Sequence, residues 1–147
     1  MIRVFALSVI LLSRLSFAGL SEQIAGDWEL KSRSCNKTKQ KLANSYVLSF
    51  EGKTGSVVSK NKDCLQVELE TLEYPSSNTV SVKSGMRECT PNPCAADFAA
   101  KECGKEGATT VTYTVKLAND GKTMTLTTND TKECAAPAVL TFQKEKH

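Results

Sequence analysis

Apolar and polar residues alternate along most of the chain with a period of two, which is typical of strands that have one buried face. The first such stretch, residues 26–35, places Trp28 and Leu30 on one face and Glu29 and Arg33 on the other. We therefore predict a strand here, with the tryptophan and the leucine in the core and the charged residues in solvent.

Seven further stretches, most of them bounded by turn residues, are predicted strands. They are residues 45–51, 56–60, 64–74, 79–86, 109–117, 122–128 and 138–144. Asn119-Asp120-Gly121 is a strong hairpin signal. The lysine-rich residues 36–44 are predicted to be a loop, and residues 20–25 a lead-in of about one helical turn.

The stretch from Cys64 to Glu70 alternates most clearly, so its aliphatic residues are predicted to face inward and its polar residues outward (Leu65, Val67 and Leu69 against Gln66, Glu68 and Glu70). After Thr71 the phase slips, which predicts a bulge of the kind that bends barrel strands. Glu68 and Glu70 are then a solvated face and not a catalytic carboxylate pair.

Residues 87–108 interrupt this pattern with three cysteines and two prolines. A short helix is predicted from Pro93 to about Glu102, with Asn92 as its N-cap and Gly104 after its end. If that helix is continuous, Cys94 and Cys103 are too far apart to bridge and need other partners.

Eight sequential strands with one apolar face each predict an all-β fold, an eight-stranded antiparallel up-and-down barrel with one short helix in the cysteine-rich loop. In such a meander, alternate connections lie at opposite ends. The turns at Gly52, Pro75 and Asn119 then share one end, and all six cysteines lie at the other.

The aromatic residues predicted to face the barrel interior are the candidate ligand contacts: Tyr46, Phe50, Tyr113 and Phe142. A barrel of eight strands is wide enough either to be filled by side chains or to hold one small ligand. The pattern leaves both possibilities open.

Residues 1–18 have the features of a cleavable signal peptide: Arg3, an apolar segment and Ser16-Phe17-Ala18 before the expected cut. We therefore expect one domain, residues 19–147, in the periplasm or secreted, without stable membrane insertion. Removal of Arg3 and Arg14 lowers the net charge from +3 to +1. This near-neutral balance disfavours nucleic acid as a partner.

The cysteines number six, all after the signal segment, and we expect disulfides in an oxidising compartment (Cys35, Cys64, Cys89, Cys94, Cys103 and Cys134). Their spacing does not fit a zinc site, and the single histidine, His147, is the last residue. No serine or cysteine nucleophile therefore has a histidine base, and we expect no enzyme activity, metal or cofactor.

Gly26-x-Trp28 at the head of the first strand of an exported eight-strand chain resembles the opening motif of lipocalins and of small bacterial lipocalin-like proteins. The resemblance covers residues 24–146 and implies a calycin-type barrel whose tryptophan closes one end while small apolar ligands enter the other. Lys144 or Lys146 would take the place of the late arginine of the family.

A second resemblance is to the META or HslJ-type domain of bacterial envelopes. It rests on Leu48-Ser49-Phe50-Glu51-Gly52, followed by Gly55-Ser56-Val57-Val58.

Two functions follow. The first is a non-catalytic carrier of a small apolar ligand, as the lipocalin resemblance implies. The second is an interaction or inhibitor module, against a protease or an envelope partner, that acts through the disulfide-stapled loop 87–108. The candidate contacts on that loop are charged: Arg87, Glu88, Asp97, Lys101 and Lys105.

Overall fold

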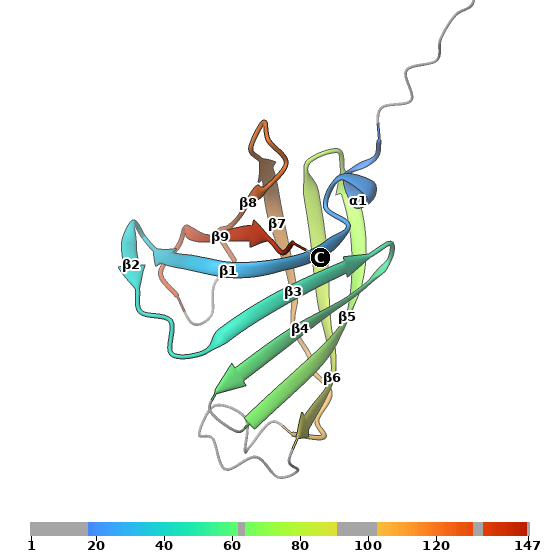
Figure 1. The fold of residues 1–147 in the computed structure, drawn as a ribbon, viewed down its shortest axis with the longest axis vertical. Helices are drawn as coiled ribbons and strands as arrows, with labels where there is room; N and C mark the ends of the chain where they lie inside the picture. Colours follow the sequence, from blue (N-terminus) through green and yellow to red (C-terminus); the bar gives the residue numbers. More distant parts are fainter. Residues whose placement is uncertain (1–17, 62–63, 91–102, 131–133, 147) are drawn as a thin grey trace, which may run out of the picture.

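The fold is one antiparallel sheet that closes on itself, as seen in a computed structural model that describes residues 18–61, 64–90, 103–130 and 134–146 (Figure 1). The helix is α1 (Leu20–Gln23). The strands are β1 (Gly26–Cys35), β2 (Thr38–Gln40), β3 (Ser45–Glu51), β4 (Thr54–Asn61), β5 (Cys64–Ser76), β6 (Thr79–Thr90), β7 (Thr110–Leu117), β8 (Thr123–Thr128) and β9 (Ala138–Lys144).

Each strand from β3 to β8 pairs with the next one along the chain, and β1 pairs with both β3 and β9, so eight strands form the ring. The predicted all-β barrel is confirmed. The predicted loop 36–44 is wrong in part, because β2 folds back on the end of β1. Asn36 and Lys37 adopt positive φ angles, the conformation that a two-residue hairpin turn requires.

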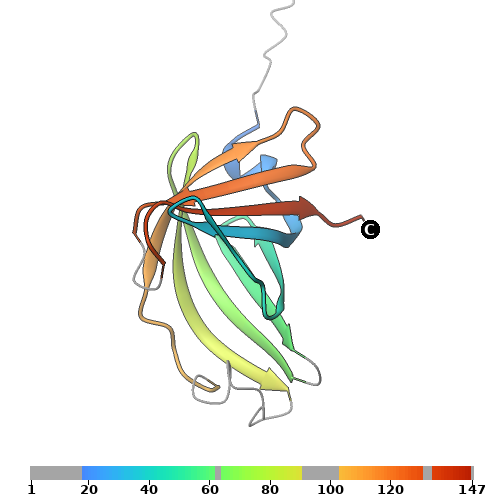
Figure 2. The same ribbon diagram turned by 90° about the vertical axis from the view of Figure 1, so that its left-hand side faces the viewer.

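The connections alternate between two ends of the barrel, as a meander requires. We call the end with the β3–β4, β5–β6 and β7–β8 turns the turn end and the opposite end the cysteine end. Two disulfides at the cysteine end, Cys35–Cys134 and Cys89–Cys103, join the ends of β1 and β6 to neighbouring loops. β5 and β6 extend far toward this end (Figure 2). The predicted helix at residues 93–102, with Cys94, lies outside the described residues.

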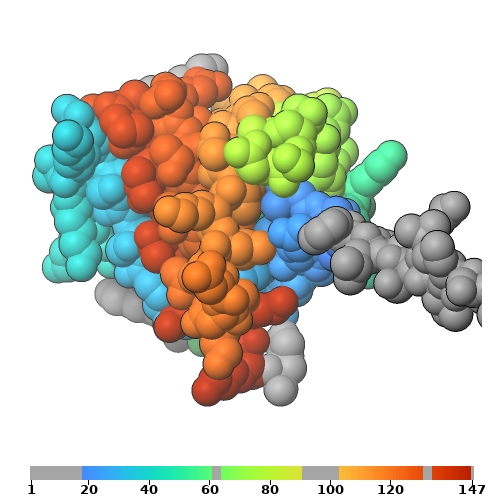
Figure 3. Space-filling model, turned by 90° about the horizontal axis from the view of Figure 1, so that it is seen from above, coloured from blue at the N-terminus to red at the C-terminus, as the bar shows by residue number. Residues whose placement is uncertain are grey.

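The turn-end half of the barrel is filled by apolar side chains. Trp28 is fully buried there, and its Nε1 donates a hydrogen bond of 2.8 Å to the carbonyl oxygen of Ile24. Leu20 and Ile24 join the same core, so the segment with α1 closes this end. In Figure 3 this segment, in blue, lies against the β5–β6 turn and the β7–β8 turn.

The predicted phase of β5 is wrong. Leu69, expected inside, is 52% exposed, whereas Glu70, expected outside, is only 9% exposed. Leu72 is in the core, and because alternate residues of a strand share a face, Glu70 and Glu68 point into the barrel with it. β5 keeps one phase from Glu70 through Leu72 to Tyr74, and its predicted irregularity lies further on, as a register shift with β6 between Glu73 and Ser76. The predicted solvated face of Glu68 and Glu70 is therefore the inner face.

Candidate functional site

The inner face of β5 changes character halfway along the barrel. Toward the turn end it carries Leu72, and toward the cysteine end it carries Glu70, Glu68 and Gln66. Gln66 and Glu70 are both buried. The strand therefore places two carboxyl groups and an amide where the alternation of the sequence predicted aliphatic residues.

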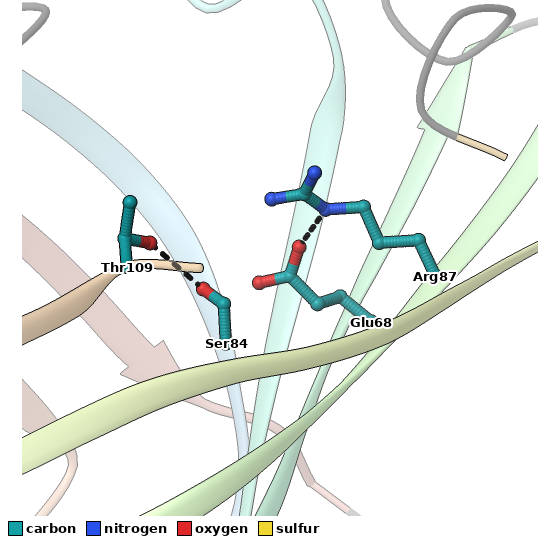
Figure 4. Close-up of polar contacts among 4 residues, drawn as sticks. All are labelled: Glu68, Ser84, Arg87 and Thr109. Atoms are coloured by element: carbon teal, nitrogen blue, oxygen red, sulfur yellow. Dashed lines mark hydrogen bonds and ion pairs between the residues drawn. The ribbon is translucent and has the colours of Figure 1, made fainter. Parts of the chain in front are cut away.

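A bulge in β6 supplies the partner of Glu68. Glu70 pairs with Ser84 and Glu68 with Arg87, so two residues of β6, Gly85 and Met86, stand opposite Leu69 alone. The extra residue reverses the phase of β6 and turns Arg87 inward. Its Nε then donates to a carboxylate oxygen of Glu68 (Figure 4).

A second bulge acts in the same way on β1. The register with β9 shifts between Leu30 and Ser32, after which Arg33 pairs with Leu140. Leu140 packs on the core, and residues directly opposite each other share a face, so Arg33 lies on the inner face. Its predicted position in solvent is wrong.

Because of the two bulges, two arginines face the interior of the barrel, while the described lysines are on its surface. Arg33 and Arg87 are the two arginines of residues 19–147, and both lie on the inner face. Each lysine whose exposure the structure describes is exposed. Arginine tolerates partial burial better than lysine and forms hydrogen bonds in a fixed geometry. The placement of both arginines inside the barrel therefore suits an interior that holds polar groups in defined positions.

Glu70 is the least satisfied group of this interior. Its Oε2 is buried and accepts no hydrogen bond within the part of the chain that the structure describes. Gly55, opposite on β4, has no side chain to offer. Ser84, opposite on β6, has its hydroxyl 3.1 Å from that of Thr109 (Figure 4). Burial, and then repulsion from Glu68, raise the pKa of Glu70 from 4.5 to about 8.

Tyr113 of β7 belongs to the same interior. It pairs with the core residue Val80 and so shares the inner face. Burial, and then the charge of Glu70, raise the pKa of its phenol, while Arg33 lowers it and Asp130 raises it further. Charged groups from β1, β5 and the loop after β8 therefore act on the Tyr113 hydroxyl.

Solvent reaches this half of the interior and not the other. Trp28, Val80 and Met124 of the turn-end half are 0% exposed. The side chains of Glu68 and Arg87 point inward and yet keep 17% and 21% exposure. We call the inward-facing residues of the cysteine-end half the inner polar cluster: Gln66, Glu68, Glu70, Ser84 and Arg87.

The four predicted ligand contacts differ in how deeply they are buried. Phe50 and Phe142 are 2% and 4% exposed and belong to the packed core. Tyr46 and Tyr113 are half-buried, and Tyr113 pairs with Val80 and packs against the core, while its phenol is influenced by the charge of Glu70. Tyr46 receives a hydrogen bond of 3.0 Å from Asn44.

The opening motif lies at the turn end. Gly26 has a φ of 108°, which favours glycine, and Trp28 packs behind it. The ammonium of Lys144 is 5.3 Å from the centre of the Trp28 ring, within cation–π range. Of the two lysines expected to replace the late arginine, Lys144 is therefore the one at the tryptophan.

The predicted contacts on loop 87–108 are also divided. Arg87 is inside the barrel with Glu68, whereas Glu88 and Lys105 are exposed. Asp97 and Lys101 lie outside the described residues. The sequence prediction missed Gln66, Glu70 and Ser84, and the available signal was the alignment of Glu70 and Glu68 in phase with Leu72.

Two solved structures share this arrangement of strands. One is a lipocalin-like protein from Bacteroides uniformis ATCC 8492, with a TM-score of 0.56 and 16% identity over 84% of this chain and 99% of that chain. The chain has a lipocalin-like fold. The other is an uncharacterized protein from Bacteroides eggerthii DSM 20697, with a TM-score of 0.53 and 15% identity over 83% of this chain and 99% of that one.

No protein-family model and no curated protein matches the sequence. The resemblance to META or HslJ-type domains stays a prediction. Within the described ranges no helix is long and apolar enough to cross a membrane, and no group of three or more His, Cys, Asp or Glu could hold a metal ion.

Proposed function

We propose that the protein is a non-catalytic binding protein that takes a small molecule into the cysteine-end half of its lipocalin-like barrel. The observation that carries this proposal is the contrast between the two halves of the interior. The turn-end half is packed with apolar side chains, while the inner polar cluster is reached by solvent. A ligand would displace water there without disturbing the core.

The lining of this half suggests a ligand with an apolar body and one polar group. Tyr46, Tyr113 and Leu140 offer partly buried apolar surface on the inner face. Polar groups that converge among such residues are what orients a small ligand in a binding site. Here those groups come from β5 and β6.

Native mass spectrometry tests this function. Protein purified without detergent is expected to carry a small-molecule adduct, and Tyr113→Ala is expected to lose it. Thr112→Ala is the matched control, since Thr112 is the exposed neighbour on the same strand. An adduct retained by Tyr113→Ala, or wild-type protein that stays empty when incubated with a small-molecule library, would contradict the proposal.

Export is part of the same proposal. Two disulfides indicate folding in an oxidising compartment. Residues 1–18 would act as the signal peptide, leaving a domain that begins near Gly19 and works in the periplasm or outside the cell. N-terminal sequencing of the protein from its own host should find this cut, and an intact Met1 would contradict it.

A second candidate function is an interaction module beside loop 87–108. It is favoured by three exposed apolar side chains on the outer face of β5 and β6: Leu65 at 37%, Leu69 at 52% and Met86 at 43% exposure. Exposed apolar groups of this kind mark protein contacts. Leu69→Ser with Met86→Ser should abolish capture of an envelope or protease partner, and the adduct should remain.

A further inference from the structure

We propose that Glu70 is the binding site for an organic ammonium group, and that the cation binds as the carboxyl releases its proton. This inference rests on the proposed function and names the chemical class of its ligand. It begins from geometry: a carboxyl group that is 9% exposed, that points into the barrel, and whose buried Oε2 accepts no hydrogen bond from the described residues.

The surroundings explain why the protein leaves this oxygen unpaired. On β4 the opposite residue is Gly55, and on β6 it is Ser84, whose hydroxyl is engaged with Thr109. Toward the turn end Leu72 offers only apolar atoms. Toward the cysteine end Arg87 is paired with Glu68. A buried polar group without a partner costs free energy, so a donor that reaches Oε2 from outside would be stabilising.

A cation fits better than the other ligand classes. Two effects keep the proton on Glu70, namely burial and repulsion from Glu68. An ammonium group reverses both, because it supplies an opposite charge and hydrogen-bond donors to the ionised carboxylate. A carboxylate brings no hydrogen-bond donor to Oε2 and, like a phosphate, adds negative charge where an ionised Glu70 would lie, and a neutral donor brings no charge to balance the ionised carboxylate.

Glu68 on β5 is the charged group that acts on Glu70. Arg87 on β6 is paired with Glu68, and yet burial, and then the charge of Glu68, still raise the pKa of Glu70. Tyr113 on β7 is influenced by Glu70, and also by Arg33 on β1 and Asp130 after β8. In the binding step the glutamic acid loses one proton to solvent and its carboxylate pairs with the ligand ammonium. One proton is therefore released for each cation bound below pH 8.

Isothermal titration calorimetry tests this inference with three probes that share a phenylethyl group: phenethylamine, 2-phenylethanol and 3-phenylpropanoate. The amine is expected to bind more tightly than the other two. Its affinity should rise by about tenfold per pH unit up to about pH 8 and then level off, because one proton leaves per ligand. The binding enthalpy should also be measured at one pH below 8 in two buffers of different ionisation enthalpy, phosphate and Tris. The difference between the two enthalpies should correspond to the release of about one proton per ligand.

Glu70→Gln keeps the shape of the side chain but cannot ionise. It is expected to weaken phenethylamine binding by about tenfold or more at pH 8 and to abolish the pH dependence. Glu73→Gln, an exposed carboxyl on the same strand, is the matched control and should bind like wild type. Thermal denaturation of both variants shows that each is folded.

The outcomes separate this inference from the proposed function. Equal binding of the alcohol or the carboxylate, or amine binding unaffected by Glu70→Gln, would overturn the ammonium site while leaving a binding barrel. The same holds if none of the three probes binds but native mass spectrometry shows an adduct. If no probe binds and native mass spectrometry shows no adduct, both the ammonium site and the proposed binding function are overturned.

Discussion

At the scale of single residues, the buried carboxyl of Glu70 makes the stability of the free protein depend on pH. Its pKa is raised to about 8 in the fold, against 4.5 for an ordinary glutamate. Between these values the folded state holds a proton that the unfolded state has lost. Stability contributed by this group is therefore full below pH 4.5 and is lost as the pH rises to about 8.

Glu70→Gln should remove this loss. The variant and wild type are expected to unfold with similar free energies near pH 4.5, and the variant should gain about 1.4 kcal/mol on wild type per pH unit, up to about 5 kcal/mol at pH 8. Urea unfolding across this pH range measures the difference. A constant gap between the two proteins would mean that Glu70 is not buried.

The Arg87–Glu68 pair supplies the next prediction. Arg87→Met leaves Glu68 charged and partly buried, and should cost about 3 kcal/mol of unfolding free energy. Glu68→Gln added to Arg87→Met should recover more than half of that cost, because the unpaired charge is gone. Urea unfolding of the single and double variants checks this, and additive losses would contradict an inner pair.

Single inner residues were the hardest feature to predict from sequence. Leu65, Val67 and Leu69 are as apolar as a core face requires, so local alternation pointed to the wrong side of β5. Leu72 determines the orientation of β5, because its burial in the core fixes which face of the strand points inward. Long-range packing overrode the local pattern.

At the scale of elements, the bulges of β1 and β6 determine which side chains face the polar half of the interior. β1 and β6 each reverse their phase once, and each reversal turns an arginine inward. The strands themselves, their order and the turn after Leu117 follow from sequence, since apolar alternation and Asn-Asp-Gly are strong local signals. A bulge has no such signal in one sequence, and neither does the short hairpin of β2.

Gly85 makes the β6 bulge possible. A Cβ at this position would stand 2.6 Å from the backbone carbonyl oxygen of Leu69, which cannot move without breaking the sheet. Gly85→Ala should therefore lower the unfolding free energy by about 1–3 kcal/mol. Gly19→Ala, with no atom within 4 Å, is the control and should change it by less than about 0.5 kcal/mol. Equal stabilities would show that the bulge lies elsewhere.

At the scale of the whole molecule, one end of the barrel is closed by packed apolar side chains and the other is cross-linked by disulfides. The prediction that the cysteines gather at one end is confirmed for the two bridges described, Cys35–Cys134 and Cys89–Cys103. It followed from strand order alone. Their pairing did not, because connectivity depends on how the loops pack.

The two bridges should differ in strength. Cys35–Cys134 closes 99 residues and Cys89–Cys103 closes 14. The cross-link that closes the longer loop restricts the unfolded chain more, by about 1–2 kcal/mol on the chain-entropy estimate. Cys35→Ser with Cys134→Ser should therefore lower the melting temperature further than Cys89→Ser with Cys103→Ser, as calorimetry can measure. The reverse order would argue against this entropic account.

The most direct test of a polar, ligand-accepting interior is a ¹³C NMR titration of the glutamate side-chain carboxyl groups, with the Glu70 signal assigned by its absence in Glu70→Gln. If β5 faces as described, the Glu70 signal shifts with a midpoint near pH 8. A midpoint near 4.5 would place that carboxyl in open solvent and contradict the orientation on which both the proposed binding function and the proposed ammonium site depend.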